Sequence, residues 1–260
     1  MDTGQDSAAW RAARRIDIGG RRLALRAMGR GQPAVVLEMG LGADGSFFDP
    51  IAQRMAAYTR VVWYDHAGLG RSDPAPTPRT IADLAADLHA LLRAAQIPLP
   101  YVLAGHSLGG LTVRFYQHQY PAEVAALVLI ESAHEAQRER LLAALPPESG
   151  DEPPAVARYR HALLVNWADP TANDERIDNL ANTALMRDCA PLGRLPLVVV
   201  SRGRADAPAG FPPALVADRE RAWRRMQCDL AALSSQSTHL IAERSGHLVN
   251  RDQPELVVEG

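Results

Sequence analysis

Short hydrophobic runs recur along the chain, and longer stretches with helical periodicity separate most of them. A run of four or five mainly apolar residues between Gly, Pro or polar residues is typical of a strand buried on both faces. Six such runs predict strands over Ala34–Leu37, Val61–Tyr64, Tyr101–Ala104, Ala126–Ile130, Leu197–Val200 and His239–Ala242. Strands that alternate with helices favour a parallel sheet with helices on both faces.

Amphipathic helices and one hairpin complete this pattern. Apolar residues repeat at intervals of three and four over residues 80–95 and 214–233, and the stretch LGGLTVRFYQHQY follows the third hydrophobic run. Ahead of the first run, RRIDIGGRRLALRAMG predicts an antiparallel hairpin that turns at Gly19-Gly20. The expected fold class is therefore α/β, with a mostly parallel but mixed central sheet.

One long interval contains no convincing strand. Between the fourth and fifth hydrophobic runs, the helical patches RERLLAAL, YRHALLVNW and RIDNLANTALMRD are separated by proline-containing segments. A structureless loop of this length is uncommon in a compact domain. We therefore expect a single domain with a core over residues 12–131 and 194–260 and a helical cap inserted at residues 132–193.

Composition narrows the function classes. The chain is 47% hydrophobic and 22% charged with a net charge of −2, so neither nucleic acid nor a charged membrane surface is an expected partner. All 28 basic residues are arginine, which excludes a Schiff-base or P-loop lysine. The two cysteines are far apart and no metal-binding motif occurs, so we expect no metal and no cofactor.

Membrane and export signals are also missing from the sequence pattern. The stretch MDTGQDSAAWRAARR has no apolar segment like that of a signal peptide, and no apolar run is long enough for a transmembrane helix. A cytoplasmic protein is the expectation, and the oligomeric state is left open.

A serine with small neighbours lies at one strand-to-helix junction. The pentapeptide Gly105-His106-Ser107-Leu108-Gly109 follows a predicted strand and precedes a predicted helix. The two glycines allow a sharp turn that exposes the Ser107 hydroxyl, and the helix N-terminus offers N–H groups to an oxyanion. This arrangement is typical of a nucleophile elbow, which makes Ser107 the candidate nucleophile.

A nucleophilic serine needs a base, and His247 has the best position. It follows the last predicted strand in SGHLVNRDQPELV, at the carboxyl end of the sheet, where sites of open α/β sheets lie. His106 is expected to point away from the hydroxyl and to pack, and His66 is interpreted as structural. His134 lies in the expected cap, where it could contact substrate.

Two carboxylates compete for the role of orienting this base. Glu131 directly follows the fourth predicted strand, and Asp206 follows the fifth. Both would lie at the carboxyl end of the sheet. Arg202 and Arg204 are close to Asp206 in sequence and offer it a simple ion-pair role instead. The residues alone leave both carboxylates open.

The chain resembles the α/β-hydrolase superfamily over essentially its whole length, through GHSLG, DHAGLGRSD, SGHLVNRDQPELV and the order Ser, acid, His. In most members the acid follows the strand equivalent to the fifth run, which would be Asp206. In one branch of haloalkane dehalogenases, pancreatic-type lipases and zearalenone-type lactonases, it lies about two dozen residues after the nucleophile. Glu131 lies 24 residues after Ser107, so this resemblance favours Glu131.

The same resemblance implies an oxyanion hole formed by the backbone N–H groups of Leu41 and Leu108. The family usually has His-Gly before the first donor, whereas this chain has Met39-Gly40. Asp65 matches a position that fixes loop structure. Serine in place of an aspartate nucleophile disfavours dehalogenase and epoxide-hydrolase chemistry.

The expected activity is hydrolysis of a small-molecule carboxylic ester, thioester or lactone through a Ser-His-acid triad and an acyl-enzyme. The expected cap contributes Trp167, His134, Tyr159 and Met186 as candidate pocket residues. Cofactor-free haloperoxidase or perhydrolase activity and carbon–carbon bond hydrolysis use the same triad and are alternatives. A non-catalytic small-molecule receptor is a further alternative.

Overall fold

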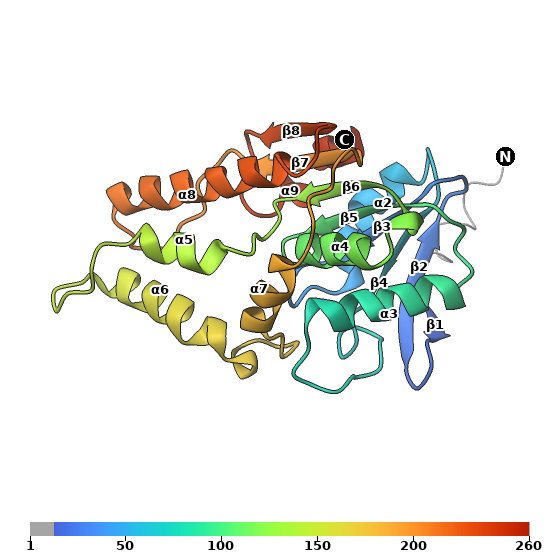
Figure 1. Cartoon of the computed structure of the whole chain (residues 1–260), viewed down its shortest axis with the longest axis horizontal. Helices are drawn as coiled ribbons and strands as arrows, with labels where there is room; N and C mark the ends of the chain where they lie inside the picture. The colour runs from blue at the N-terminus through green and yellow to red at the C-terminus, as the bar shows by residue number, and fades with distance from the viewer. Residues whose placement is uncertain (1–12, 260) are drawn as a thin grey trace.

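The computed structural model describes residues 13–259, which fold around one eight-stranded sheet with the order β1-β2-β4-β3-β5-β6-β7-β8 (Figure 1). The strands are β1 (Arg14–Asp17), β2 (Arg22–Met28), β3 (Ala34–Glu38), β4 (Val61–Tyr64), β5 (Tyr101–His106), β6 (Val124–Ile130), β7 (Leu197–Arg202) and β8 (Ser237–Ala242). The pairs β1–β2 and β2–β4 are antiparallel and the others are parallel. The predicted strands, the hairpin and the mixed sheet are confirmed.

Helices fill the intervals between the strands. Those of four residues or more are η1 (Gly45–Phe48), α2 (Asp49–Met55), α3 (Ile81–Ala94), α4 (Leu108–Gln119), α5 (Gln137–Ala143), α6 (Pro154–Leu164), α7 (Asn179–Arg187), α8 (Pro213–Ala231), α9 (Val249–Asp252) and α10 (Pro254–Glu259). Short 3-10 turns lie at η2 (Pro121–Glu123), η3 (Asn166–Ala168) and η4 (Pro170–Ala172). Sequence periodicity did not predict α2.

Apolar side chains are buried on both faces of the sheet, as the hydrophobic runs require. One core contains side chains of α3 and α4 together with Leu230 of α8, and the other contains side chains of α2 with Val249 and Val257. Helix α3 begins at a capping box in which Thr80 and Asp83 bond to each other's backbone N–H. Each fully buried aliphatic side chain contributes about 1.5–3 kcal/mol, so these two layers hold the strand ends in fixed positions.

Residues 131–196, between β6 and β7, are helical and include α5, α6 and α7. Their apolar side chains do not pack only on each other. Leu141 of α5 and Leu163 of α6 form one cluster with Trp223 and Met226 of α8. Figure 1 shows α5, α6 and α8 extending together beyond the edge of the sheet. The division into a core and a cap stays a prediction, because α8 packs on the sheet through Leu230 and on α5 and α6 through Trp223 and Met226.

No helix within residues 13–259 is long and apolar enough to cross a membrane.

Candidate active site

Ser107 lies at the junction of β5 and α4 with a backbone φ of 54°. A positive φ is strained for a residue with a side chain, and such strain is found at functional turns. A Cβ atom on Gly105 would lie 2.3 Å from the Gly109 carbonyl oxygen, and one on Gly109 would lie 2.4 Å from the Glu38 carbonyl oxygen. The sharp turn therefore requires glycine at both of these positions.

Glu131 and His247 come together at the carboxyl edge of the sheet. Glu131 is the residue after β6, and its side chain is fully buried; His247 lies between β8 and α9 with its side chain 33% exposed. The Nδ1 atom of His247 is 3.5 Å from Oε1 of Glu131. Burial alone would raise the pKa of the Glu131 carboxyl, but His247 and the Arg202 guanidinium lower it below the ordinary value.

Arg202, the last residue of β7, is the second partner of Glu131. Its backbone N–H donates to Oε2 of Glu131 at 2.9 Å, and its guanidinium donates to Oε1 of the same carboxylate. On its other side the guanidinium donates to Glu220 of α8 at 2.9 Å, and it lies over the ring of Trp223 at 4.5 Å. The arginine is buried, so two carboxylates and one guanidinium form a continuous interior ion pair.

This geometry corrects the interpretation that Arg202 and Arg204 pair with Asp206. Asp206 is exposed, and within residues 13–259 its carboxylate has no hydrogen bond or ion pair; only its backbone N–H and carbonyl are bonded, to Glu220 and Arg219. Of the two carboxylates that the sequence left open, Glu131 is the one at ion-pair distance from His247.

His106 supports the loop that carries His247. Its Nε2 donates to the His247 carbonyl oxygen at 2.9 Å, and the two rings lie 4.7 Å apart. Burial lowers the pKa of His106 to about 4, with a smaller contribution from His247, so the ring is neutral at neutral pH. The packing role expected for His106 thus includes a hydrogen bond to the backbone beside the candidate base.

A cavity of about 380 Å³ opens above Ser107. Its lining includes Ser107, Leu108, Leu41, His247, Asp206, His134 and Trp167, and many of its other residues are polar: Gln137, Asn166, Asn173, Asn179, Asn182 and Thr183. The expectation that Tyr159 and Met186 line this pocket is wrong. Tyr159 packs edge-on against Phe211, and Met186 faces the sheet core, where it is 2% exposed.

The two backbone donors expected for an oxyanion hole belong to the elbow itself and to the loop that packs against it. The Leu108 N–H is in the first turn of α4, where backbone N–H groups have no intrahelical acceptor. The loop that carries Leu41 packs against the elbow, since a Cβ atom on Gly40 would lie 3.1 Å from Cβ of Ser107. Both leucines line the cavity with Ser107.

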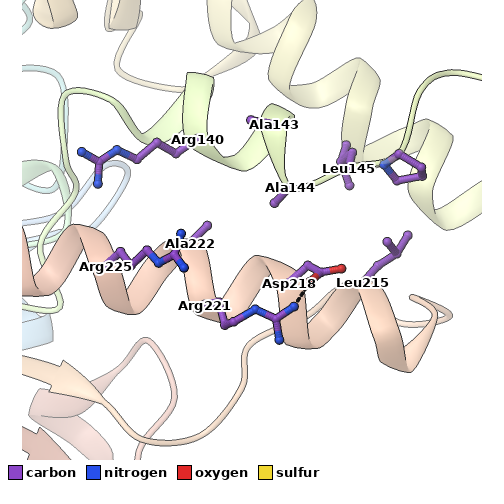
Figure 2. A pocket seen from close by; sticks show the side chains of 10 residues that line it. Arg140, Ala143, Ala144, Leu145, Leu215, Asp218, Arg221, Ala222 and Arg225 are labelled. Atoms are coloured by element: carbon purple, nitrogen blue, oxygen red, sulfur yellow. Dashed lines mark hydrogen bonds and ion pairs between the residues drawn. The ribbon is translucent and has the colours of Figure 1, made fainter.

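A second cavity, of about 680 Å³, lies between α5 and α8 (Figure 2). Arg140, Arg221 and Arg225 border it, and Arg221 is paired with Asp218. It shares no lining residue with the cavity above Ser107. Within the described part of the chain, no group of three or more His, Cys, Asp or Glu side chains could hold a metal ion.

The sequence of this chain was compared with known protein families. Residues 33–183, more than half of the chain, match the family described as alpha/beta hydrolase fold. The chain belongs to this family.

Individual relatives are more distant. The "Putative carbamate hydrolase RutD" of Azorhizobium caulinodans is 33% identical over 130 residues, covering 46% of this chain and 48% of that protein. The "Probable transporter efuK" of Hormonema carpetanum is 32% identical over 128 residues, covering 46% and 18% respectively. The chain thus matches less than half of the length of either relative. A thermophilic esterase from Thermogutta terrifontis has a TM-score of 0.63 and 21% identity over 92% of this chain and 91% of its own, a likeness of fold.

Proposed function

We propose that the chain is a serine hydrolase of carboxylic esters, thioesters or lactones, with Ser107 as nucleophile, His247 as base and Glu131 as the orienting acid. One observation carries the proposal. The strained serine at the elbow and the imidazole of His247 line the same cavity, and a buried carboxylate lies 3.5 Å behind that imidazole. A base beside the hydroxyl with a carboxylate behind it is what activates a serine nucleophile, and these positions support that role.

In the proposed reaction, the Ser107 oxygen attacks the substrate carbonyl carbon while His247 takes the hydroxyl proton. The N–H groups of Leu41 and Leu108 donate to the carbonyl oxygen as it becomes an oxyanion. The tetrahedral intermediate collapses, the bond to the leaving alkoxide breaks, and His247 returns the proton to it. Water, deprotonated by His247, then hydrolyses the acyl-enzyme and releases the acid.

The cavity volume of about 380 Å³ supports a small substrate, and the polar lining supports one with hydrogen-bonding groups. The helices of residues 132–193 act as the cap in this proposal, and Trp167 and His134 contact the part of the substrate that does not react. Asp206 also lines the cavity, but it is exposed and has no part in the proposed triad. Carbamate esters belong among the substrates to be tested, because RutD is named as a carbamate hydrolase.

A fluorophosphonate probe tests the nucleophile directly. We expect the wild-type protein to be labelled and to hydrolyse p-nitrophenyl butyrate, and we expect Ser107→Ala to lose both properties, with turnover reduced by several orders of magnitude. The matched control is Ser46→Ala, which changes a serine outside the cavity. Equal labelling of the Ser107→Ala variant, or no labelling of the wild type, would refute the proposal.

The alternative activities need a second measurement, because they use the same triad. Peracid formation from acetate and hydrogen peroxide, measured beside ester hydrolysis on the same preparation, separates a perhydrolase from an esterase. Faster peracid formation than ester turnover would contradict the assignment to esters while leaving Ser107 as the nucleophile.

A further inference from the structure

Three buried ionisable side chains from distant parts of the sequence form a second ionic cluster beside the cavity. The Nδ1 atom of His66 lies 2.8 Å from Oε2 of Glu175, and its Nε2 atom lies 2.9 Å from Oε1 of Glu38. None of the three side chains has exposed area. They come from the end of β3, the loop after β4 and the helical segment between β6 and β7.

Both nitrogens of His66 carry protons in this cluster. Burial alone would lower the pKa of His66, but the charges and hydrogen bonds of Glu38 and Glu175 raise it to about 10. An imidazolium with a carboxylate on each nitrogen donates two charge-assisted hydrogen bonds. Because each of these bonds has a defined direction, His66 fixes the position of the Glu175 carboxylate.

The other oxygen of this carboxylate reaches the loop that carries Leu41. Oε1 of Glu175 accepts a hydrogen bond from the Gly42 N–H at 2.6 Å. Gly42 has a φ of 74° and is the residue directly after Leu41. Met39 precedes the same loop and has no strong hydrogen-bonding group in its side chain, so it cannot hold the loop by a side-chain hydrogen bond.

The segment around Glu175 is itself anchored. The Arg79 N–H donates to the Arg176 carbonyl at 3.0 Å, and the Asp178 N–H donates to the Arg79 carbonyl at 2.8 Å. On the opposite side, the Glu38 carbonyl lies against the helix that begins at the elbow, since a Cβ atom on Gly109 would be 2.4 Å from its oxygen. The loop is therefore held between a fixed carboxylate and the nucleophile elbow.

From these contacts we infer that Glu175 is a positioning residue for the oxyanion hole. Its hydrogen bond to Gly42 holds the peptide unit next to Leu41, so that the Leu41 N–H faces the reacting carbonyl oxygen, and His66 and Glu38 keep the carboxylate in place. This inference rests on the proposed hydrolytic function. Glu175 does not touch the substrate and acts through the backbone of the loop.

Charge and position predict opposite effects for Glu175→Gln. Removal of a negative charge beside the oxyanion hole would by itself favour the oxyanion and raise kcat. Glutamine has only one acceptor oxygen, so either the Gly42 N–H or the protonated Nδ1 of His66 loses its acceptor, and the side chain is no longer fixed. The loop then shifts a donor that acts mainly in the transition state, and small displacements of this kind cost about 100-fold. A fall in kcat therefore reports the positioning role.

The kinetic test compares Glu175→Gln with Asp174→Asn, its exposed neighbour, which removes the same charge from the same segment. With p-nitrophenyl butyrate we expect kcat of Glu175→Gln to fall about 10–100-fold, KM to change by less than about threefold, and the inhibition constant of phenylboronic acid to rise with the loss of kcat. The Asp174→Asn variant should stay within about twofold of the wild type. An unchanged or higher kcat, a loss confined to KM, or an equal loss in the control would overturn the inference.

A measurement on the wild-type protein does not depend on activity or on the folding of a variant. A short hydrogen bond to a carboxylate should move the Gly42 amide proton downfield and protect it from exchange relative to the Gly68 amide, which donates to an ordinary backbone carbonyl at 2.9 Å. A Gly42 amide proton that exchanges rapidly with water would contradict the hydrogen bond from Gly42 to Glu175 and overturn the inference. If the wild type hydrolyses no ester but this proton is protected, the proposed function fails, whereas the role of Glu175 in fixing the Leu41 loop is retained.

Discussion

Replacing Glu131 with glutamine tests which of the two candidate carboxylates, Glu131 or Asp206, orients His247. The change exchanges one buried carboxylate oxygen for an NH2 group and removes the negative charge 3.5 Å from Nδ1 of His247. Without that charge the imidazole loses the partner that holds its tautomer and stabilises its protonated form. An amide in place of the orienting acid reduces kcat by about 10⁴-fold in a related triad, so we expect a loss of about 10³–10⁴-fold.

The same substitution disturbs the interior ion pair. Arg202 loses one of its two carboxylate partners and keeps Glu220, so its charge does not become fully unpaired. Loss of a hydrogen bond to a charged group costs about 1.5–3 kcal/mol, and we expect the free energy of unfolding to fall by about that amount. Thermal denaturation therefore has to accompany the kinetics, and the assay temperature must lie below the transition of the variant.

The matched control is Asp206→Asn, which removes the same charge from an exposed side chain. Because this carboxylate has no ionic or hydrogen-bond partner within residues 13–259, we expect kcat/KM within about twofold of the wild type and a stability change below about 0.5 kcal/mol. Initial rates with p-nitrophenyl butyrate, measured from well below to well above KM, supply both kcat and kcat/KM for the comparison. A large loss in Asp206→Asn together with near wild-type activity in Glu131→Gln would refute the reasoning.

Two further predictions concern stability. His66 has a pKa of about 10 in the folded protein against 6.5 ordinarily, so its contribution is complete below pH 6.5 and is lost as the pH rises through 10. The Tm of the wild type should therefore fall more steeply from about pH 7 to about pH 10 than that of His66→Gln, and parallel curves would contradict this. Gly109→Ala places a Cβ atom 2.4 Å from the Glu38 carbonyl oxygen and should cost about 2 kcal/mol or more in urea denaturation. Gly150→Ala, where nothing lies within 4 Å, is its control, and equal stability of the two would contradict the packing argument.

The features that could be predicted from the sequence were those with a local cause. A strand buried on both faces needs a continuous apolar run, so each of the six runs corresponds to a strand, and the Gly19-Gly20 pair marks the hairpin. The position of Ser107 followed from the glycines that a sharp strand-to-helix turn requires. Helix α2 was missed because it has only seven residues, too few for its periodicity to be distinguished.

Two of the ionic pairings could not be predicted, because their members are far apart in the sequence and no motif links them. Arg202 meets Glu131 across 71 residues, and His66 meets Glu175 across 109. Local pattern assigned Arg202 to the nearby Asp206, whereas strand order places the ends of β6 and β7 side by side and turns the guanidinium inward. Tyr159 and Met186 were misplaced for a related reason, since periodicity does not say which helix each apolar face meets.

The double role of α8 limits how this chain can be recombined with its relatives. An exchange of residues 132–193 alone would leave Trp223 and Met226 without the α5 and α6 side chains that now cover them. It would also remove the carboxylate that bonds to Gly42. A transferable substrate pocket therefore consists of this segment together with α8 and a compatible Leu41 loop, and a chimera that carries only the inserted helices should fold poorly.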